Sequence, residues 1–198
     1  MCQFFESICV KDGVLYNLSN HQLRVNKTLR SFNTPENTIS LSTIVNGLSI
    51  PSSGWYKLRI SYALSGAHLA EFVSYQFKTI ATFSLVDIQG KHYDFKWNNR
   101  DWINEALKHS GKDEIIMHDQ GLIKDSSYAN IVFNDGINWV TPEAPLLEGT
   151  QRAKLIQDGI IKTGCIHIES LPQFQSFKLI NAMLDWENAI NYPISLIL

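Results

Sequence analysis

The sequence predicts an α+β fold with two closely packed lobes. Stretches rich in β-branched and aromatic residues are mixed with isolated helical patterns, without a regular strand–helix–strand alternation. The 198 residues suffice for one large domain or two small ones, and a 44% hydrophobic content can bury a substantial core. We expect a small N-terminal α+β lobe over residues 1–75 and a larger lobe over 76–198, with a ligand in the cleft that they share.

Composition argues against several classes of partner. The formal net charge is −2 and the 17 Lys and Arg residues are scattered, so nucleic acid is not the leading partner. No window reaches the roughly 18 apolar residues that span a bilayer, and the N-terminus lacks the pattern of an export signal. Three irregularly spaced cysteines and six dispersed histidines indicate neither disulfides nor a metal site. A cytoplasmic protein with reduced thiols is expected.

The small lobe is expected to begin with a hairpin, because Asp12-Gly13 supports the positive φ angles of a tight turn. A helix follows, with Ser19 or Asn20 as its N-cap. The predicted elements are strands over 4–10 and 14–16, a helix over 19–32, a weakly periodic helix over 39–47, and strands over 55–64 and 71–75.

The large lobe is expected to mix strands with two helices. The first helix is capped by Asn98 or Asn99 and ends before Gly111, and the second opens at Gly149 and ends at Gly159. The predicted strands cover 79–86, 93–95, a meander of 114–118, 122–123 and 130–133, and 166–168, with 171–174 and 177–184 closing the core.

Lys96 is a candidate catalytic residue. It follows a predicted strand and lies between Phe95 and Trp97, just before a helix. Apolar neighbours lower the pKa of a lysine, as a lysine nucleophile requires. The alternative is an ordinary solvated lysine at the end of a strand.

Two further segments offer binding chemistry. Gly149 and Thr150 open a helix, where free N–H groups and the helix dipole favour an anion such as phosphate. The alternative is an ordinary capped helix. Asp125 precedes a strand that is expected to be buried, so it is either a turn-capping carboxylate or a partner for a cationic ring nitrogen.

Short motifs follow one another along nearly the whole chain in a specific order. They are Phe5-Glu6, Asp12-Gly13, His21-Gln22-Leu23-Arg24, Lys96-x-x-Asn99-Arg100, Asp113-Glu114-Ile115, Gly121-Leu122-Ile123-Lys124-Asp125, Asn130-Ile131-Val132-Phe133, Asp135-Gly136, Thr141-Pro142, Gly149-Thr150-Gln151-Arg152 and Asn181-Ala182. This order resembles the class IV pyridoxal-phosphate (PLP) aminotransferases, which include branched-chain aminotransferases, D-amino acid aminotransferases and aminodeoxychorismate lyases. The resemblance implies their two-lobed fold with a trimmed small lobe, a PLP cofactor and a homodimer.

The resemblance also implies roles for residues around the cofactor's reactive end and ring. Lys96 matches the lysine that the family joins to PLP and that later moves protons. Asp125 stands where the family usually has Glu and would keep the pyridine nitrogen protonated. Arg24 matches the arginine that grips the phosphate. Arg59, in a predicted small-lobe strand, would hold a substrate carboxylate; the alternative is a surface arginine.

The remaining cofactor-binding residues implied by the resemblance lie in the large lobe. Thr150 and Gln151 match the residues whose backbone N–H groups complete the phosphate cup. Asn181 and Ala182 match a second turn that contacts phosphate. Asn130 would fix the strand that carries the cofactor.

The resemblance favours a lyase that converts 4-amino-4-deoxychorismate to p-aminobenzoate and pyruvate, a reaction of folate biosynthesis. Lys96-x-x-Asn99-Arg100 looks like the lyase version of its motif, and Asn181-Ala182 replaces a Thr-containing turn of branched-chain aminotransferases. One alternative is an aminotransferase that uses branched-chain or D-amino acids with 2-oxoglutarate. Another is a noncatalytic relative that binds PLP without turning over an amine.

Overall fold

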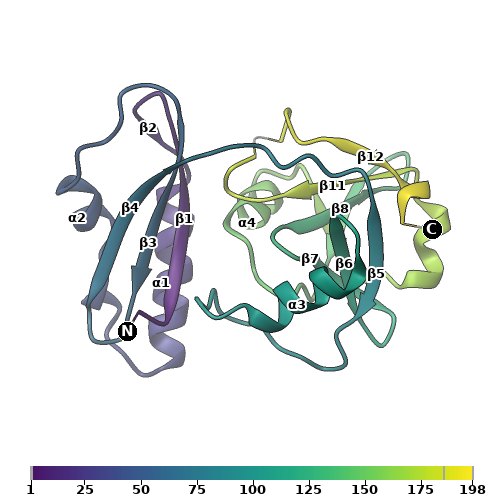
Figure 1. Cartoon of the computed structure of the whole chain (residues 1–198), viewed down its shortest axis with the longest axis horizontal. Helices are drawn as coiled ribbons and strands as arrows, with labels where there is room; N and C mark the ends of the chain where they lie inside the picture. Colours follow the sequence, from purple (N-terminus) through teal and green to yellow (C-terminus); the bar gives the residue numbers. More distant parts are fainter. Residues whose placement is uncertain (1, 185, 198) are drawn as a thin grey trace. The chain divides into compact units, whose positions relative to one another are not determined.

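The computed structural model describes residues 2–184 and 186–197 and divides the chain into two compact units. The first unit comprises the chain up to Phe77 together with Phe95–Asn99, and the second comprises Lys78–Asp94 and the chain from Arg100 onward. Figure 1 draws most of the first unit in purple to blue and most of the second in teal to yellow. The expected boundary after residue 75 lies close to this division, but residues 95–99, expected in the larger lobe, pack with the first unit.

The first unit is built on a four-stranded antiparallel sheet in the order β2-β1-β3-β4. Its strands are β1 (Phe4–Lys11), β2 (Val14–Leu15), β3 (Trp55–Tyr62) and β4 (His68–Ser74). Asp12 and Gly13 have φ angles of 49° and 82°, so the predicted hairpin turn is confirmed.

Two helices, α1 (Leu18–Ser31) and α2 (Leu41–Asn46), and the 3₁₀ turn η1 (Glu36–Thr38) accompany this sheet. The sheet face that packs with the helices is apolar, and the shared core includes Phe4, Ile8, Val10, Val25, Leu29, Leu41, Leu58 and Ile60. On β3 the alternate residues, which include Lys57 and Arg59, are only half-buried. The unit therefore has one apolar sheet face under the helices and a second face that carries polar side chains.

The start of α1 differs from the prediction. The N-cap is Asn17, in the left-handed conformation with φ 59°, and not Ser19 or Asn20. Asparagine tolerates this conformation, and the chain can turn there directly from the hairpin into the helix. The weakly predicted second helix is present, and the Ser40 side chain caps it by accepting a hydrogen bond from Thr43 N.

Residues 96–98 extend the first sheet along the free edge of β1. Phe4 and Trp97 form an isolated antiparallel bridge, Phe5 N donates to Lys96 O at 3.0 Å, and Asn98 N donates to Gln3 O at 2.8 Å. The predicted strand over 93–95 is wrong. Its residues are rich in β formers, but the partner strand β1 meets the chain only from Lys96 onward.

The second unit contains two sheets. The first has the order β5-β6-β7 and the second the order β10-β9-β8-β11-β12. Their strands are β5 (Phe83–Asp87), β6 (Glu114–Asp119), β7 (Leu122–Ser126), β8 (Asn130–Asn134), β9 (Trp139–Pro142), β10 (Lys162–Gly164), β11 (Ser176–Ile180) and β12 (Asn191–Pro193). A core of buried apolar side chains joins both sheets and includes Phe83, Ile116, Ile123, Ile131, Phe133 and Phe177.

The predicted meander is wrong, because β7 and β8 belong to different sheets. Ser126 and Ala129 exchange backbone and side-chain hydrogen bonds across a tight turn. This turn, which begins at the end of β7, lets the chain leave the first sheet before β8 starts the second.

Two helices connect parallel strands in the second unit. α3 (Asp101–Ser110) joins β5 to β6, and α4 (Thr150–Gln157) joins β9 to β10. The N-cap of α3 is Arg100, so neither Asn98 nor Asn99 caps it as predicted; Asn98 instead donates to backbone carbonyls near the N-terminus. Gly111 and Gly159 end the two helices as expected.

The predicted strand over 166–168 is wrong. His167 makes one bridge to Leu122 and then caps a 3₁₀ helix, η2 (Ile168–Gln173), while the strand that pairs with β9 is β10. A last 3₁₀ turn, η3 (Ile194–Leu196), follows β12. Among the residues that the structure describes, no helix is long and apolar enough to cross a membrane.

Candidate active site

A buried cluster of three charged or titratable residues connects β1 to α1. Glu6 and His21 are fully buried, and Arg24 lies one helical turn after His21. His21 Nδ1 donates to Glu6 Oε2 at 2.6 Å, while Arg24 donates through Nε to Oε1 at 2.9 Å and through Nη2 to Oε2 at 2.5 Å. The Glu6 carboxylate therefore holds the Arg24 guanidinium through two hydrogen bonds.

Charges within this cluster are balanced by pairing. Burial raises the pKa of Glu6, but Arg24 and His21 outweigh it and lower that pKa to about 2. Burial lowers the pKa of His21, and the positive charges of Arg24 and Lys96 lower it further, against the opposing effect of Glu6. His21 is therefore neutral near pH 7, and its Nδ1 carries the proton that Glu6 accepts.

Lys96 and Arg59 meet at one aromatic ring. Lys96 Nζ lies 4.7 Å from the centroid of the Phe5 ring, and Arg59 Cζ lies 3.9 Å from it. Both cations are attracted to the Phe5 ring, which limits the distance between the Lys96 ammonium and the Arg59 guanidinium. The β-bridge along β1 places the Lys96 backbone, so the lysine stands on a supported strand edge.

Asn98 fixes the orientation of Arg59. Its amide nitrogen donates to Cys2 O at 2.7 Å and to Phe4 O at 3.3 Å, so its oxygen must face the other way. That oxygen accepts from Arg59 Nη2 at 2.6 Å. The first unit thus gathers three predicted site residues, Lys96, Arg24 and Arg59, around one end of β1.

Asp125 is the central polar residue of the second unit. It is buried at the end of β7, where Oδ1 accepts from Asn130 Nδ2 at 2.7 Å and Oδ2 accepts from Leu147 N at 2.8 Å. Burial raises the pKa of Asp125 to about 7, although these hydrogen bonds and the charge of Arg152 lower it. Asn130 also donates to Leu147 O at 2.8 Å, so it fixes the loop before α4 to the start of β8.

The start of α4 packs closely against Asn130. A Cβ atom on Gly149 would lie only 1.9 Å from Asn130 Oδ1, so the backbone approach requires glycine. Thr150 is buried and Gln151 is half-buried in the first turn of the helix. The helix N-terminus, Asn130 and Asp125 therefore form one connected group.

Asn181 and Ala182 lie beside the same group. Ile180, the last residue of β11, pairs with Asn130, so the turn that follows β11 flanks the start of β8. Asn181 Oδ1 accepts from Met183 N at 2.8 Å and shapes this turn. The structure thus brings together Asp125, Asn130, Thr150, Gln151, Asn181 and Ala182 in the second unit.

Sequence reasoning assigned no role in the site to Phe5, Glu6 or Asn98, although Phe5-Glu6 was a motif of the resemblance and Asn98 a candidate helix cap. Glu6 carried a detectable signal, because it lies on the apolar face of an alternating strand, where an acid needs a buried cation. The HxxR spacing of His21 and Arg24 supplies that partner from one helix face. The bridging role of Phe5 depends on sheet register and had no comparable signal.

Comparison with known proteins identifies the family. The family model for amino-transferase class IV matches residues 3–188. The chain belongs to the class IV aminotransferases. It is a PLP-dependent enzyme, and structures of similar proteins contain PLP.

Three similar proteins illustrate this relationship. A Haemophilus influenzae protein described as uncharacterized is 32% identical over 187 residues, covering 92% of this chain and 98% of its own. A crystal structure from Haemophilus somnus 129PT, provisionally named a 4-amino-4-deoxychorismate lyase, is 33% identical with a TM-score of 0.84 and covers 96% of this chain and 98% of its own. A PLP-bound hypothetical aminotransferase from Mycobacterium tuberculosis shares the fold, with a TM-score of 0.77, 16% identity, and coverage of 96% and 79%.

The residues of each unit fit PLP. The first unit offers a lysine amine at the Phe5 ring and an arginine anchored by Glu6, which suit the aldehyde and the phosphate of the cofactor. The second unit offers a buried carboxylate next to a helix N-terminus. Burial raises the pKa of Asp125, and a protonated pyridine nitrogen is a cationic partner that would favour its carboxylate form.

Proposed function

We propose that the protein is a lyase that converts 4-amino-4-deoxychorismate to p-aminobenzoate and pyruvate. The observation that carries this proposal is the meeting of Lys96 and Arg59 at the Phe5 ring. It gives a lysine for proton transfer and an arginine for a substrate carboxylate within one unit. The similarity to the Haemophilus somnus protein supports the same reaction.

The proposed mechanism assigns a task to each residue. PLP, when bound, supplies an electron sink for cleavage of the bond to the departing enolpyruvyl group. Lys96 Nζ removes the ring proton and acts as the general base and acid. Arg59 orients the substrate through a carboxylate, while Phe5 and Asn98 hold its guanidinium.

Further residues are proposed to hold the cofactor. Arg24 and the first turn of α4, with Thr150 and Gln151, bind the phosphate. Asp125 keeps the pyridine nitrogen protonated, and Asn130 orients Asp125. The Asn181-Ala182 turn contributes to phosphate binding. The homodimer, the cytoplasmic location and the place in folate biosynthesis stay predictions.

An aminotransferase is the second candidate, because the family model itself describes aminotransferases. In that reaction Lys96 carries out a 1,3-proton shift, and the amino group of the donor passes to 2-oxoglutarate, which becomes glutamate. Purified enzyme should release pyruvate from 4-amino-4-deoxychorismate under the first proposal. Glutamate formation without pyruvate release would favour the second.

The role of Lys96 is tested by Lys96→Ala, with Lys91→Ala as a nearby matched control. Wild-type protein should show the visible absorbance of bound cofactor, and borohydride should fix the cofactor to Lys96 in a peptide map. Lys96→Ala should lose both this label and activity, whereas Lys91→Ala should keep them. Activity in Lys96→Ala would exclude the proposed role, and label without turnover in the wild type would indicate a noncatalytic PLP-binding protein.

A further inference from the structure

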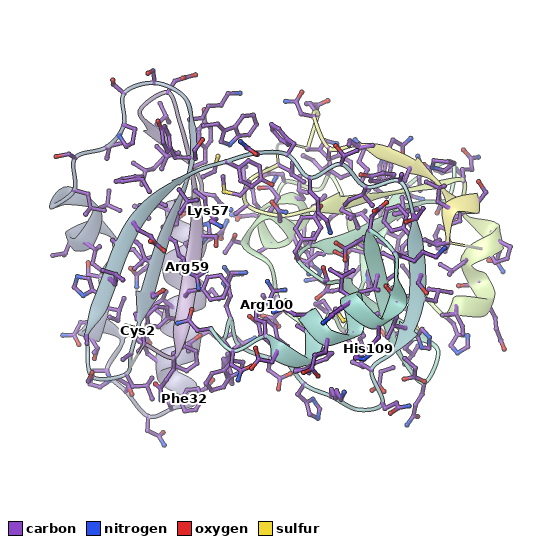
Figure 2. All side chains as sticks on the ribbon, viewed as in Figure 1. Cys2, Phe32, Lys57, Arg59, Arg100 and His109 are labelled. Atoms are coloured by element: carbon purple, nitrogen blue, oxygen red, sulfur yellow. The ribbon has the colours of Figure 1, made fainter. Side chains whose placement is uncertain are left out.

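The polar face of the first sheet carries a series of cations. Directly paired residues share a face, and the register pairs Ser7 with Arg59 and Cys9 with Lys57. Lys57 and Arg59 are two residues apart on β3, about 7 Å along the strand, and point to the same side. Figure 2 labels the two residues next to each other on β3. Lys96, beside Phe5, continues the series toward β1.

Arg59 and Lys57 differ in their surroundings. Arg59 donates to Asn98, and its Nε lies 3.9 Å from Glu71 Oε1 on β4. Lys57 is half-buried and pairs across the sheet with Cys9 and Val73, neither of which is an acid. Among residues 2–184 and 186–197, its ammonium has no hydrogen bond or ion pair.

Positive charge on this face exceeds negative charge. Lys96, Arg59 and Lys57 follow one another, while Glu71 is the acid that faces Arg59. A half-buried ammonium next to a second cation is unfavourable unless an anion joins them. The arrangement therefore suits a ligand with an anionic group beyond the one that Arg59 binds.

We propose that Lys57 binds a second carboxylate of the substrate, so that the enzyme selects amines that carry two carboxylates. This inference rests on the proposed function, in which the substrate amine lies at Lys96 and one carboxylate at Arg59. 4-Amino-4-deoxychorismate has a ring carboxylate and an enolpyruvyl carboxylate, and the spacing of Arg59 and Lys57 along β3 suits two separate groups. Lys57 is thus a specificity-determining residue that branched-chain amino acids, with one carboxylate, would not use.

The test is calorimetric titration of the PLP-bound enzyme with chorismate, which has both carboxylates but no amine, and with benzoate, which has one. Lys57→Met should weaken chorismate binding by about 10-fold or more, the usual effect of losing a charged hydrogen bond. Benzoate binding should change by less than about 2-fold. Lys57→Arg should restore most of the affinity for chorismate.

Lys11→Met is the matched control. Lys11 pairs with Trp55, one row beyond Lys57 on the same face, and its ammonium lies over the Trp55 ring at 4.6 Å. This substitution also removes one positive charge, so it should leave chorismate affinity nearly unchanged if Lys57 acts by direct contact. An equal loss in both variants would show general electrostatic attraction and overturn the proposal.

Two further outcomes would also overturn it: unchanged chorismate affinity in Lys57→Met, or no chorismate binding by the wild-type enzyme. The cofactor absorbance and the borohydride label at Lys96 are recorded for every variant. Loss of these signals in the wild type is a failure of the proposed function. Normal signals with unchanged affinity in Lys57→Met are a failure of this inference alone.

Discussion

Glu6 holds together the part of the first unit that places Arg24. Its carboxylate accepts from both Arg24 and His21 in a buried site. Glu6→Gln keeps the shape of the side chain but leaves the Arg24 charge without its counterion. Because a broken buried ion pair is costly, we expect a loss of about 3–5 kcal/mol in the free energy of unfolding. Urea denaturation at pH 7 measures this loss.

Glu36→Gln is the control for this prediction. The Arg30–Glu36 pair is exposed, with 61% and 42% of the two side chains accessible. Exposed pairs contribute little, so its loss should cost less than about 1 kcal/mol. Equal effects of the two substitutions would mean that Glu6 is not a structural anchor.

Asp125 gives the protein without PLP a distinctive dependence on pH. Its folded-state pKa is raised from 3.8 to about 7, so the folded protein retains a proton that the unfolded chain has lost. The contribution of Asp125 to stability therefore falls as the pH rises from about 4 to 7 and is constant above that range. His21, whose pKa is lowered from 6.5, acts in the opposite sense below about pH 6.5. Glu6, with a pKa lowered to about 2, also acts in the opposite sense and only below about pH 4.5.

Urea denaturation at pH 5, 6, 7 and 8 tests this behaviour. Asp125→Asn should remove most of the decline between pH 5 and 7, because the amide does not titrate. Asp158→Asn, at the exposed end of α4, should keep the wild-type decline. An unchanged decline in Asp125→Asn would contradict the raised pKa.

The sequence predicted which residues form the candidate site better than it predicted how they are held. The motif order, through the family resemblance, predicted roles for Lys96, Arg24 and Asp125. It did not show that Phe5 lies against both Lys96 and Arg59, because that contact depends on how β1 pairs with β3 and with the segment after Phe95. The register of these pairings depends on residues that are distant in the sequence, so local β propensity does not predict it.

At the level of elements, hairpins and helix ends were predicted where one residue type decides the backbone. Asp12-Gly13, Gly111 and Gly159 have the positive φ angles expected of them. The predicted strands over 93–95 and 166–168 were wrong because β propensity does not show whether a partner strand is present. The predicted N-caps of α1 and α3 were wrong because several polar residues compete for this position, whereas α4 begins after Gly149 as predicted.

The start of α4 depends on the absence of a side chain at Gly149. Asn130 cannot move easily, because it donates to both Asp125 and Leu147. Gly149→Ala should therefore displace the helix start, lower the affinity for PLP and cost about 1–3 kcal/mol of stability. Equilibrium titration with PLP and urea denaturation measure the two effects.

Gly47→Ala is the matched glycine substitution. Gly47 has φ −88°, and a Cβ there would lie 3.5 Å from Ile44 O, an ordinary contact. Its effect on stability should stay within about 0.5 kcal/mol. If Gly149→Ala behaved in the same way, the close approach to Asn130 would matter neither for stability nor for PLP binding.

For the whole molecule, PLP should protect backbone amides in both units. The proposed ligands include residues around 22–24 and 96–98 in the first unit and around 125–130 and 149–152 in the second. Hydrogen exchange with and without PLP should show slower exchange in all four segments. α2, which holds no proposed ligand, is the internal control. Protection confined to the second unit would contradict the roles of Lys96 and Arg24.

The return of residues 95–99 to the first unit affects how the protein is made. During synthesis the first 77 residues emerge before this segment, so the N-terminal half of β1 lacks its edge partner, including the acceptor for Phe5 N. An unpaired strand edge on a nascent chain can pair with other chains. Chaperones protect such intermediates. The ribosome delivers Lys96 in the same segment that closes this edge. The first sheet therefore gains its last edge partner from the same segment that supplies the lysine of the candidate site.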